Sequence, residues 1–304
     1  MRAYITLLRL PFQLQLGPIF AWGYVLGGGR LTRAEEAWRF LTVFALFHIG
    51  AFGGLTALNS HYDRDDGPVG GLWQPPAAPA HLFLFAWTVQ LGGLILLLPF
   101  GWMLCGVYAL ILLLSLGYSH PRTRWKGHPL KSLLVVALGQ GVLDFTAGAL
   151  TAALVTNVAA RGNALQPIVM TSAALWWGMA GATCIVVGFY PLTQLYQAQS
   201  DARRGDVTTA AWLMRRWSRR GVFVFAAMML GVGACCSVAA PLAAGHTSDA
   251  RWLLPVFLLP AAVLVRWASD RLPSPQKDFA RVHFLLRAGA LAFGSYVLWA
   301  AVSW

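Results

Sequence analysis

The densest acidic cluster of this chain follows its second long apolar stretch. Asp63, Asp65 and Asp66 lie close together there, although the 304 residues include just 11 Asp and Glu against 23 Lys and Arg. If a helix continues through this point at about 100° per residue, Asn59, Asp63 and Asp66 share one stripe, and Asp65 points away. Such oxygens could bind a hard cation such as Mg²⁺, which keeps some waters and completes its shell with phosphate oxygens. The alternative is a solvated acidic helix end.

A second polar cluster follows the sixth apolar stretch and resembles the first. The residues spaced for one helical face are Tyr190, Gln194, Gln197 and Asp201. Gly205 is expected to end or loosen this helix before Asp206. Four apolar stretches separate the two clusters, which suggests two four-helix halves, about 1–118 and 131–268, plus a final helix. We therefore expect one domain spanning 1–304, with the two polar clusters facing each other between its halves.

The segment from Tyr118 to Lys131 lies between the acidic clusters and is dense in cations and aromatic side chains. Its basic residues are Arg122, Arg124, Lys126 and Lys131. Carboxylates and cations at one cavity mouth suit a divalent ion with a diphosphate, because Mg²⁺ bridges acid to phosphate while Arg124 and Lys126 neutralise the remaining oxygens. Taken alone, the segment is more typical of a basic cytoplasmic loop. Together with two acidic clusters, it favours the binding site.

The composition is that of an integral membrane protein, with 58% hydrophobic and 11% charged residues. Runs of about 20 apolar residues, enough to cross a bilayer, recur along the chain and leave no room for a soluble domain. The nine predicted spans are about 5–27, 36–60, 79–98, 101–118, 131–155, 168–196, 220–244, 251–268 and 282–303. The first run continues as a spanning helix, so no removable signal peptide is expected.

Basic residues between the spans predict the orientation in the membrane. Cytoplasmic loops carry an excess of Lys and Arg, which places the N-terminus and both acidic clusters on the cytoplasmic side and the C-terminus on the opposite side. We expect a multi-pass protein of the plasma (inner) membrane. The net charge of +12 is explained by this topology, so no nucleic-acid partner is expected.

One acid falls well inside a predicted span. Asp144 lies in the fifth apolar stretch with Gln140 one turn earlier. A charged carboxylate at such a depth costs roughly 2.5 to 3.5 kcal/mol, so we expect Asp144 to face a cavity. It could bind a second substrate, accept a proton, or be a neutral structural acid bonded to another helix.

These motifs together resemble the UbiA superfamily of intramembrane prenyltransferases. The first family motif, NDxxDxxxD, matches Asn59, Ser60 and Asp63, with Asp65 and Asp66 in place of an aspartate at Gly67. The second motif, DxxxD, matches the segment from Gln197 to Asp201, and the following Arg203, Arg204, Gly205 and Asp206 are similar to the DRxxGD continuation of many members. The segment YSHPRTRWKGHP is similar to the YSxPPxRLKxxP loop of members that prenylate chlorophyllide or homogentisate. Ser60 and Gln197 each replace a motif aspartate, so each half of the site has lost a carboxylate but keeps an oxygen.

The resemblance implies an all-α bundle of nine transmembrane helices with a central cavity open to the cytoplasm. It implies Mg²⁺-dependent transfer of an isoprenyl chain from its diphosphate to an aromatic, quinone-precursor or lipid-like acceptor. The implied catalytic residues are Asp63, Asp201 and Lys126. The implied metal ligands are Asn59, Asp63, Asp66, Gln197, Asp201 and Asp206, and the implied diphosphate ligands are Asn59, Tyr118, Ser119, Arg122, Arg124, Lys126 and Arg204. Tyr190, Gln194 and Asp144 are candidates for the cavity wall or the acceptor site.

Two other functions fit parts of the sequence. A terpene cyclase of the same architecture would ionise the same diphosphate without an acceptor, and the altered positions Ser60 and Gln197 keep that alternative open. A transporter with a cytoplasmic cation site would suit the many spans and the weak repeat. A transporter would be expected to have its polar residues near the bilayer midplane, whereas those of this sequence cluster at the membrane edge. The sequence leaves three points undecided: the identity of the acceptor, the length of the prenyl chain and the oligomeric state.

Overall fold

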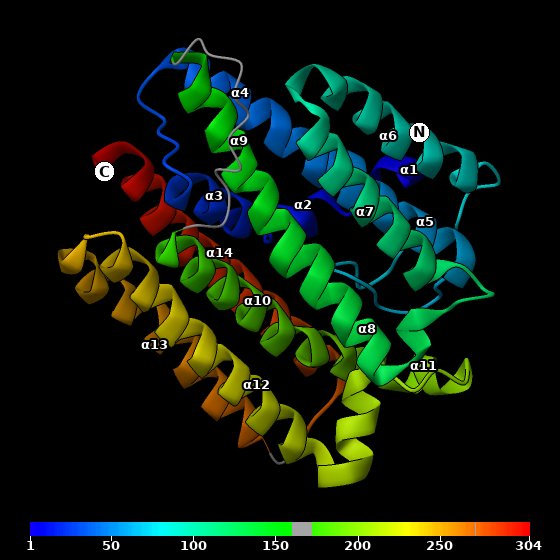
Figure 1. Cartoon of the computed structure of the whole chain (residues 1–304). Helices are drawn as coiled ribbons and strands as arrows, with labels where there is room; N and C mark the ends of the chain where they lie inside the picture. Colours follow the sequence, from blue (N-terminus) through cyan, green and yellow to red (C-terminus); the bar gives the residue numbers. More distant parts are fainter. Residues whose placement is uncertain (160–171, 271) are drawn as a thin grey trace.

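The computed structural model describes residues 1–159, 172–270 and 272–304, which form an all-helical bundle (Figure 1). In chain order the helices are α1 (Arg2–Leu7), α2 (Leu10–Gln13), α3 (Gly17–Leu26), α4 (Ala34–Ala45), η1 (Leu46–Gly53), α5 (Gly54–Asp63), α6 (Leu82–Leu97), η2 (Leu98–Phe100), α7 (Trp102–Ser119), η3 (Trp125–Gly127), α8 (Pro129–Val136), η4 (Ala137–Leu143), α9 (Asp144–Ala159), α10 (Ala173–Gln194), η5 (Leu195–Gln197), α11 (Ala198–Arg203), α12 (Thr209–Ala243), η6 (Thr247–Asp249), α13 (Ala250–Ala268) and α14 (Pro275–Ser303). Several follow one another without a break, so that α4, η1 and α5 form one rod, and α8, η4 and α9 form another.

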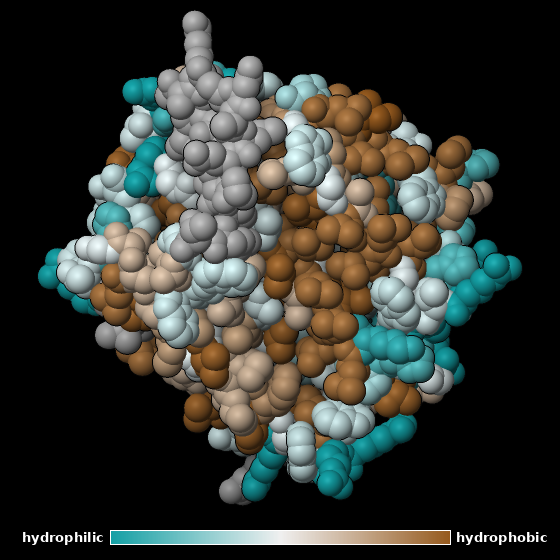
Figure 2. Space-filling model, viewed as in Figure 1, coloured by the Kyte–Doolittle hydropathy of each residue, from teal (hydrophilic) through white to brown (hydrophobic). Residues whose placement is uncertain are grey.

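Within the described ranges, eight helical segments are long and apolar enough to cross a membrane. Hydrophobic side chains cover much of the centre and upper right of the face shown in Figure 2, while hydrophilic ones gather at its upper left edge and at its right and lower edges. This distribution is expected of a protein whose central band faces lipid. The prediction of an all-α, multi-pass membrane protein is confirmed.

The first predicted span, 5–27, differs from the prediction because it is not one continuous helix. It is divided into α1, α2 and α3, and the longest piece, Gly17–Leu26, is too short to count among the spanning helices. Arg9 adopts a left-handed backbone with φ 51° between α1 and α2, which no continuous right-handed helix accommodates. Pro11 and Pro18 lie in the first turns of α2 and α3, where the missing N–H is tolerated.

Three other predicted spans have different limits. The ninth, predicted at 282–303, begins earlier as α14 at Pro275. The seventh, predicted at 220–244, begins earlier as α12 and bends at Trp217 and Ser218, where the backbone leaves the helical region. The start of the sixth, at 168–171, lies outside the described residues. Its remainder is α10 with η5.

Glycines allow the helices of the bundle to approach closely. A Cβ atom at Gly23 of α3 would lie 2.0 Å from the carbonyl oxygen of Phe145, and one at Gly148 of α9 would lie 1.9 Å from that of Phe20. The backbones of α3 and α9 therefore touch, as small residues permit in membrane bundles. Close packing of this kind fixes α9 and the rod that contains it relative to the N-terminal segment.

Two wide turns interrupt the long rods. η1 and η4 are π-helical segments in the middle of the second and fifth predicted spans. Such turns hold more residues than an α-helical turn, so they rotate the downstream face of the rod relative to a regular helix. A helical wheel drawn across either segment therefore misplaces the residues that follow.

Candidate functional site

Helix α5 ends at Asp63, and its ending decides which acids point inward. Arg64 takes a left-handed conformation with φ 48°, and its N–H bonds the carbonyl of Ser60. The chain then turns, so that the Asp65 side chain is buried to 6% exposure and lines a cavity, whereas Asp66 is exposed and does not line it. The predicted stripe of Asn59, Asp63 and Asp66 is therefore wrong in its last member, because the helix does not continue past Asp63.

The second polar cluster is built by α11 and the turn after it. Asp201 lies in α11, and Gly205, with φ 77°, ends the helix as predicted. The N–H of Asp206 bonds the carbonyl of Asp201 at 3.0 Å, which folds the Asp206 carboxylate back toward the bundle. The N–H of Val207 bonds the carbonyl of Gly127 at 3.0 Å and so ties this turn to the basic loop.

The basic loop places two cations against these acids. The Nζ of Lys126 is buried, donates to Asn59 Oδ1 at 2.7 Å and pairs with Asp63 Oδ2. Arg124 binds Asp206 in the two-pronged geometry typical of a guanidinium and a carboxylate, with distances of 2.7 and 2.8 Å. Its remaining nitrogen lies 3.5 Å from Asp63 Oδ1, so the loop bridges both acidic clusters.

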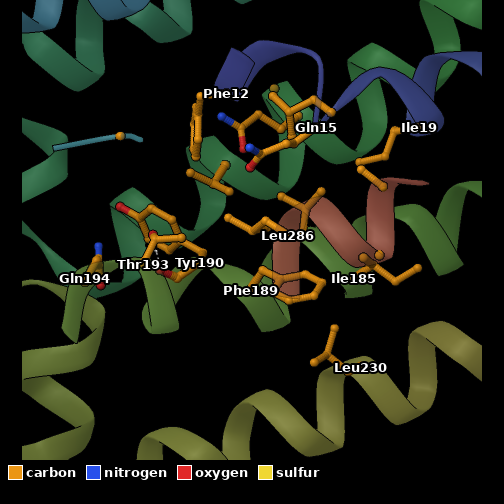
Figure 3. A pocket seen from close by; sticks show the side chains of 18 of the residues that line it. Phe12, Gln15, Ile19, Ile185, Phe189, Tyr190, Thr193, Gln194, Leu230 and Leu286 are labelled. Carbon is orange, nitrogen blue, oxygen red and sulfur yellow. Dashed lines mark hydrogen bonds between the residues drawn. The ribbon is translucent and has the colours of Figure 1, made fainter. Parts of the chain in front are cut away.

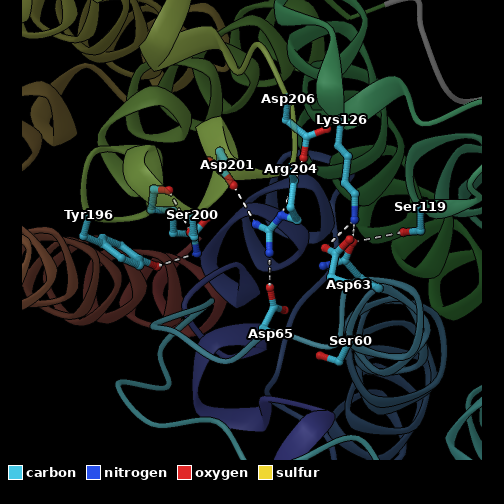
Figure 4. A network of polar contacts seen from close by, with 12 residues as sticks. Ser60, Asp63, Asp65, Ser119, Lys126, Tyr196, Ser200, Asp201, Arg204 and Asp206 are labelled. Atoms are coloured by element: carbon cyan, nitrogen blue, oxygen red, sulfur yellow. Dashed lines mark hydrogen bonds and ion pairs between the residues drawn. The ribbon is translucent and has the colours of Figure 1, made fainter.

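Arg204 lies at the centre of the polar network (Figure 4). It donates to Asp201 at 2.7 Å and to Asp65 at 3.0 Å, and its Nε is 3.7 Å from Asp206. The ends of α5 and α11 are thereby joined through one guanidinium. The prediction that the two polar clusters meet is confirmed by these contacts.

Burial shifts the pKa of two groups of the polar network that lie outside the membrane-spanning helices. It lowers the pKa of the Lys126 ammonium, a shift opposed by the neighbouring Asp63 carboxylate. It also raises the pKa of Asp65, where Asp63 adds to the effect and Arg9 opposes it. Each charge is therefore held by its partners, and removal of a partner is expected to destabilise the charge that remains.

The other predicted polar residues fall into two groups. Ser119 donates to Asn59 Oδ1 at 3.4 Å, and the hydroxyls of Tyr118 and Tyr190 lie 3.1 Å apart on the cavity wall. Arg122, by contrast, is exposed and does not line the cavity, so the structure does not bring it to the site.

Two glutamines at the end of the sixth predicted span line the cavity with different roles. Gln194 Oε1 accepts from the N–H of Ala210 at 2.9 Å and thus serves the start of α12. Gln197 donates through Nε2 to the Tyr196 hydroxyl at 3.4 Å, which leaves its Oε1 available to a ligand.

Asp144 is not on the cavity wall, so the expectation that it faces the cavity is wrong. Gln140 lines the cavity, but η4 intervenes before Asp144 and rotates it away. The buried Asp144 carboxylate instead lies 3.9 Å from His48 Nε2 of η1, and neither group has a hydrogen bond at that end. This position agrees with a structural acid facing another helix.

The polar network lines one end of a cavity of about 810 Å³, and this polar end is called the mouth below. Away from the network the wall becomes apolar, with Ile185 and Phe189 from α10, Leu230 from α12 and Leu286 from α14 (Figure 3). Phe12 and Ile19 of the N-terminal segment face them from the other side (Figure 3). The cavity therefore suits an amphiphile with an anionic head and a long apolar tail.

Two residues of the observed site are absent from the site predicted from the sequence, Asp65 and Arg9. Regular helical spacing points Asp65 away from the site, because it assumes that α5 continues past Asp63. Arg9 lines the cavity with a buried guanidinium, and the signal that could have found it is a lone cation within an apolar segment.

The donor set fits Mg²⁺ bound together with a phosphate ligand. No group of three or more His, Cys, Asp or Glu in the described residues is arranged to hold a metal by itself. Mg²⁺ commonly takes one or two carboxylates and the oxygens of a bound phosphate. Each helix end offers that kind of donor. Asp63 and Asn59 share Lys126 as a partner, and Asp201 and Gln197 both line the cavity.

Known structures share this fold over nearly the whole chain. A UbiA homologue from Archaeoglobus fulgidus bound to GPP and Mg²⁺ aligns with a TM-score of 0.64 at 17% identity, over 97% of this chain and 99% of that one. An apo UbiA homologue from Aeropyrum pernix K1 gives 0.64 at 16% identity, over 95% and 98%. A digeranylgeranylglyceryl phosphate synthase gives 0.61 at 13% identity, over 98% of each chain. No family model matches the sequence, and no curated protein matches it. The predicted resemblance to the UbiA superfamily is thus confirmed in the fold.

Proposed function

We propose that this chain is an intramembrane prenyltransferase that moves an isoprenyl chain from its diphosphate to an aromatic, quinone-precursor or lipid-like acceptor. The observation that carries the proposal is the cavity that joins a network of acids and cations to an apolar interior. The Archaeoglobus fulgidus homologue of the same fold was solved with GPP and with DMAPP, each with Mg²⁺. Those ligands have the amphiphilic form that this cavity suits.

The donor's diphosphate is placed at the polar mouth, with its tail in the apolar cavity. Lys126 and Arg124 come from the loop before α8, and Arg204 from the end of α11, so cations reach the head group from two separate segments of the chain. Charge-assisted hydrogen bonds from these groups fix the diphosphate and neutralise its oxygens. The reacting C–O bond then lies where the polar and apolar walls meet.

Mg²⁺ would be held by Asp63 with Asn59 and by Asp201 with Gln197. When bound, it would neutralise charge on the departing diphosphate. Lys126 keeps its ammonium beside Asp63 and Asn59, ready to donate to a diphosphate oxygen as negative charge develops there. The carboxylates are paired with cations, so binding of the head group requires these partners to exchange.

The aromatic groups beside the mouth complete the proposed reaction site. The hydroxyls of Tyr118 and Tyr190 lie 3.1 Å apart, and Phe189, the residue before Tyr190, also lines the cavity. Aromatic faces stabilise the positive charge that develops on the allylic carbon. A largely apolar cavity also keeps water from capturing that carbon before the acceptor attacks.

The proposed orientation puts the polar mouth on the cytoplasmic side of the plasma (inner) membrane. The basic loop at the mouth and the arginines at the start of α12 support it, since cytoplasmic loops are rich in Lys and Arg. We count α1, α2 and α3 together as the first of nine crossings, so that this orientation has the N-terminus in the cytoplasm and the C-terminus outside. The division into two four-helix halves remains part of the proposal.

Turnover by purified protein tests the function. The protein is incubated with Mg²⁺ and geranyl, farnesyl or geranylgeranyl diphosphate, with and without quinone precursors, and diphosphate release and products are measured. Release that requires the acceptor is expected, and it should be lost in Asp63→Ala and Asp201→Ala. Asp270→Ala is the control, because Asp270 pairs with Arg281 away from the cavity wall.

Other outcomes of this experiment separate the alternatives. Cyclic hydrocarbon formed without acceptor would identify a terpene cyclase. Unchanged Mg²⁺-dependent turnover in both aspartate variants would reject the assigned site. No release with any donor would reject the prenyltransferase.

A further inference from the structure

Arg9 is a buried cation at the mouth that belongs to none of the sequence motifs. It occupies the break between α1 and α2, and its side chain is 5% exposed while lining the same cavity as the four acids. A lone arginine in an apolar segment is costly to bury, so it is retained where it has a partner or a function. Its partners account for only part of its charge.

The nearest groups leave Arg9 incompletely compensated. Its Nη2 donates to the neutral Ser60 hydroxyl at 2.7 Å and lies 3.7 Å from Asp65 Oδ2. The other oxygen of Asp65 is already bound by Arg204 at 3.0 Å. The Nε of Arg9 is buried and has no hydrogen-bond partner. The guanidinium therefore retains donors and positive charge for a further anion.

The loop after α5 is built around this guanidinium. A Cβ atom at Gly70 would lie 2.4 Å from Arg9 Nη1, so the absence of a side chain there lets the loop lie directly against it. Gly70 also has φ 41°, which a glycine adopts without strain. This packing holds the guanidinium in position at the cavity wall.

We propose that Arg9 binds the diphosphate directly and supplies, beside Ser60, positive charge that would otherwise come from a divalent ion. The inference rests on the proposed function. An aspartate at position 60 would pair with Arg9 and use up its charge, whereas the serine leaves that charge available. In the described residues at the mouth, each of the four acids has a closer partner than Arg9, supplied by Arg124, Lys126 or Arg204. Arg9 is therefore the least engaged of these cations.

Binding of inorganic pyrophosphate to the purified protein tests the contact without turnover. Affinity is measured by calorimetry at fixed Mg²⁺ for the wild type, Arg9→Met, Arg9→Lys and the control Arg203→Met, whose arginine is exposed and does not line the cavity. Arg9→Met should weaken binding about tenfold or more, because hydrogen bonds between charged groups are among the strongest. Arg9→Lys should lose less, and Arg203→Met should match the wild type.

A second pair of variants keeps Arg9 in place and changes its neighbour. Ser60→Asp should bind pyrophosphate more weakly than the wild type at low Mg²⁺, because the new carboxylate pairs with Arg9. Its affinity should recover at high Mg²⁺, because the same carboxylate can bind a metal ion. Ser60→Asn introduces a side chain of nearly the same shape as aspartate but without its charge. Its pyrophosphate affinity should therefore depend on Mg²⁺ no more strongly than that of the wild type. Thermal unfolding and gel filtration verify that each variant is folded.

The outcomes separate this inference from the proposed function. Unchanged pyrophosphate affinity in folded Arg9→Met, or equal Mg²⁺ dependence of Ser60→Asp and Ser60→Asn, overturns the role of Arg9. A raised KM for the acceptor alone in Arg9→Met also overturns it, since Arg9 would then bind the acceptor. If pyrophosphate affinity is insensitive to Asp63→Ala as well, the proposed function itself fails.

Discussion

Two of the places where the described bundle buries carboxylates do so in opposite ways. At the mouth, each of Asp63, Asp201 and Asp206 has a cation within 2.8 Å. In the interior, Asp144 has no hydrogen bond, and its nearest ionisable partner is His48 at 3.9 Å. The mouth pairs come from loops and helix ends, whereas both interior residues belong to rods that cross the bundle.

The difference teaches which buried acids can serve a ligand. A carboxylate that shares several arginine and lysine partners can exchange one cation for another, so a charged ligand can enter without leaving a buried charge unpaired. A carboxylate enclosed by packed helices, such as that of Asp144, has no cation that it could exchange for a ligand. Burial alone is therefore a poor guide to function here, and the identity of the partners is the better one.

Loss of Lys126 should have the largest effect among the mouth variants. Lys126→Met leaves Asp63 buried without its ammonium partner, and it removes a donor aimed at the diphosphate. We expect kcat to fall about 100-fold or more, the range seen when one oxyanion donor is removed. The folded state should lose about 3 to 5 kcal/mol, measured by SDS titration.

Lys131→Met is the matched control, because Lys131 belongs to the same basic segment but is exposed and does not line the cavity. Its kcat and stability should match the wild type. Equal losses in the two variants would mean that the segment acts through its general charge, and the specific role of Lys126 would be rejected.

The pair between Arg124 and Asp206 should show strong coupling. Arg124→Gln and Asp206→Asn each break the two-pronged contact at 2.7 and 2.8 Å. The double variant should lose less stability than the sum of the two, with a coupling of about 0.5 to 3 kcal/mol in the free energy of unfolding. Additive losses would show that the loop and the α11 turn are held together by other contacts.

Asp65 and Asp66 are neighbours in the chain that should respond differently. Asp65→Asn removes the charge that binds Arg204 at 3.0 Å and should lower the free energy of unfolding by about 1 to 3 kcal/mol. Asp66→Asn should change it by less than about 0.5 kcal/mol, because that side chain is exposed. The reverse order would mean that α5 continues past Asp63, as regular helical spacing predicts.

Much of this fold could be predicted from the sequence because long apolar runs and basic loops carry strong signals. The segments around Lys126 and Asp201 were found for the same reason, since polar residues are scarce in this chain. The failures occur where the backbone leaves regular helix. Arg64 in its left-handed conformation turns Asp65 inward, and η4 rotates Asp144 away from the cavity. Spacing rules assume a constant rotation per residue, so neither event is visible to them.

The smallest effect on turnover is expected from the interior acid. Asp144→Asn keeps the size of the side chain and replaces a group that does not line the cavity, so kcat and the donor KM should stay within about twofold of the wild type. His48→Gln should behave alike, because His48 faces Asp144 and is equally absent from the wall. If Asp144→Asn instead abolished turnover in a folded protein, the acid would take part in proton transfer or acceptor binding. The contrast between the mouth and the interior would then fail, because a carboxylate without exchangeable partners would be serving the reaction.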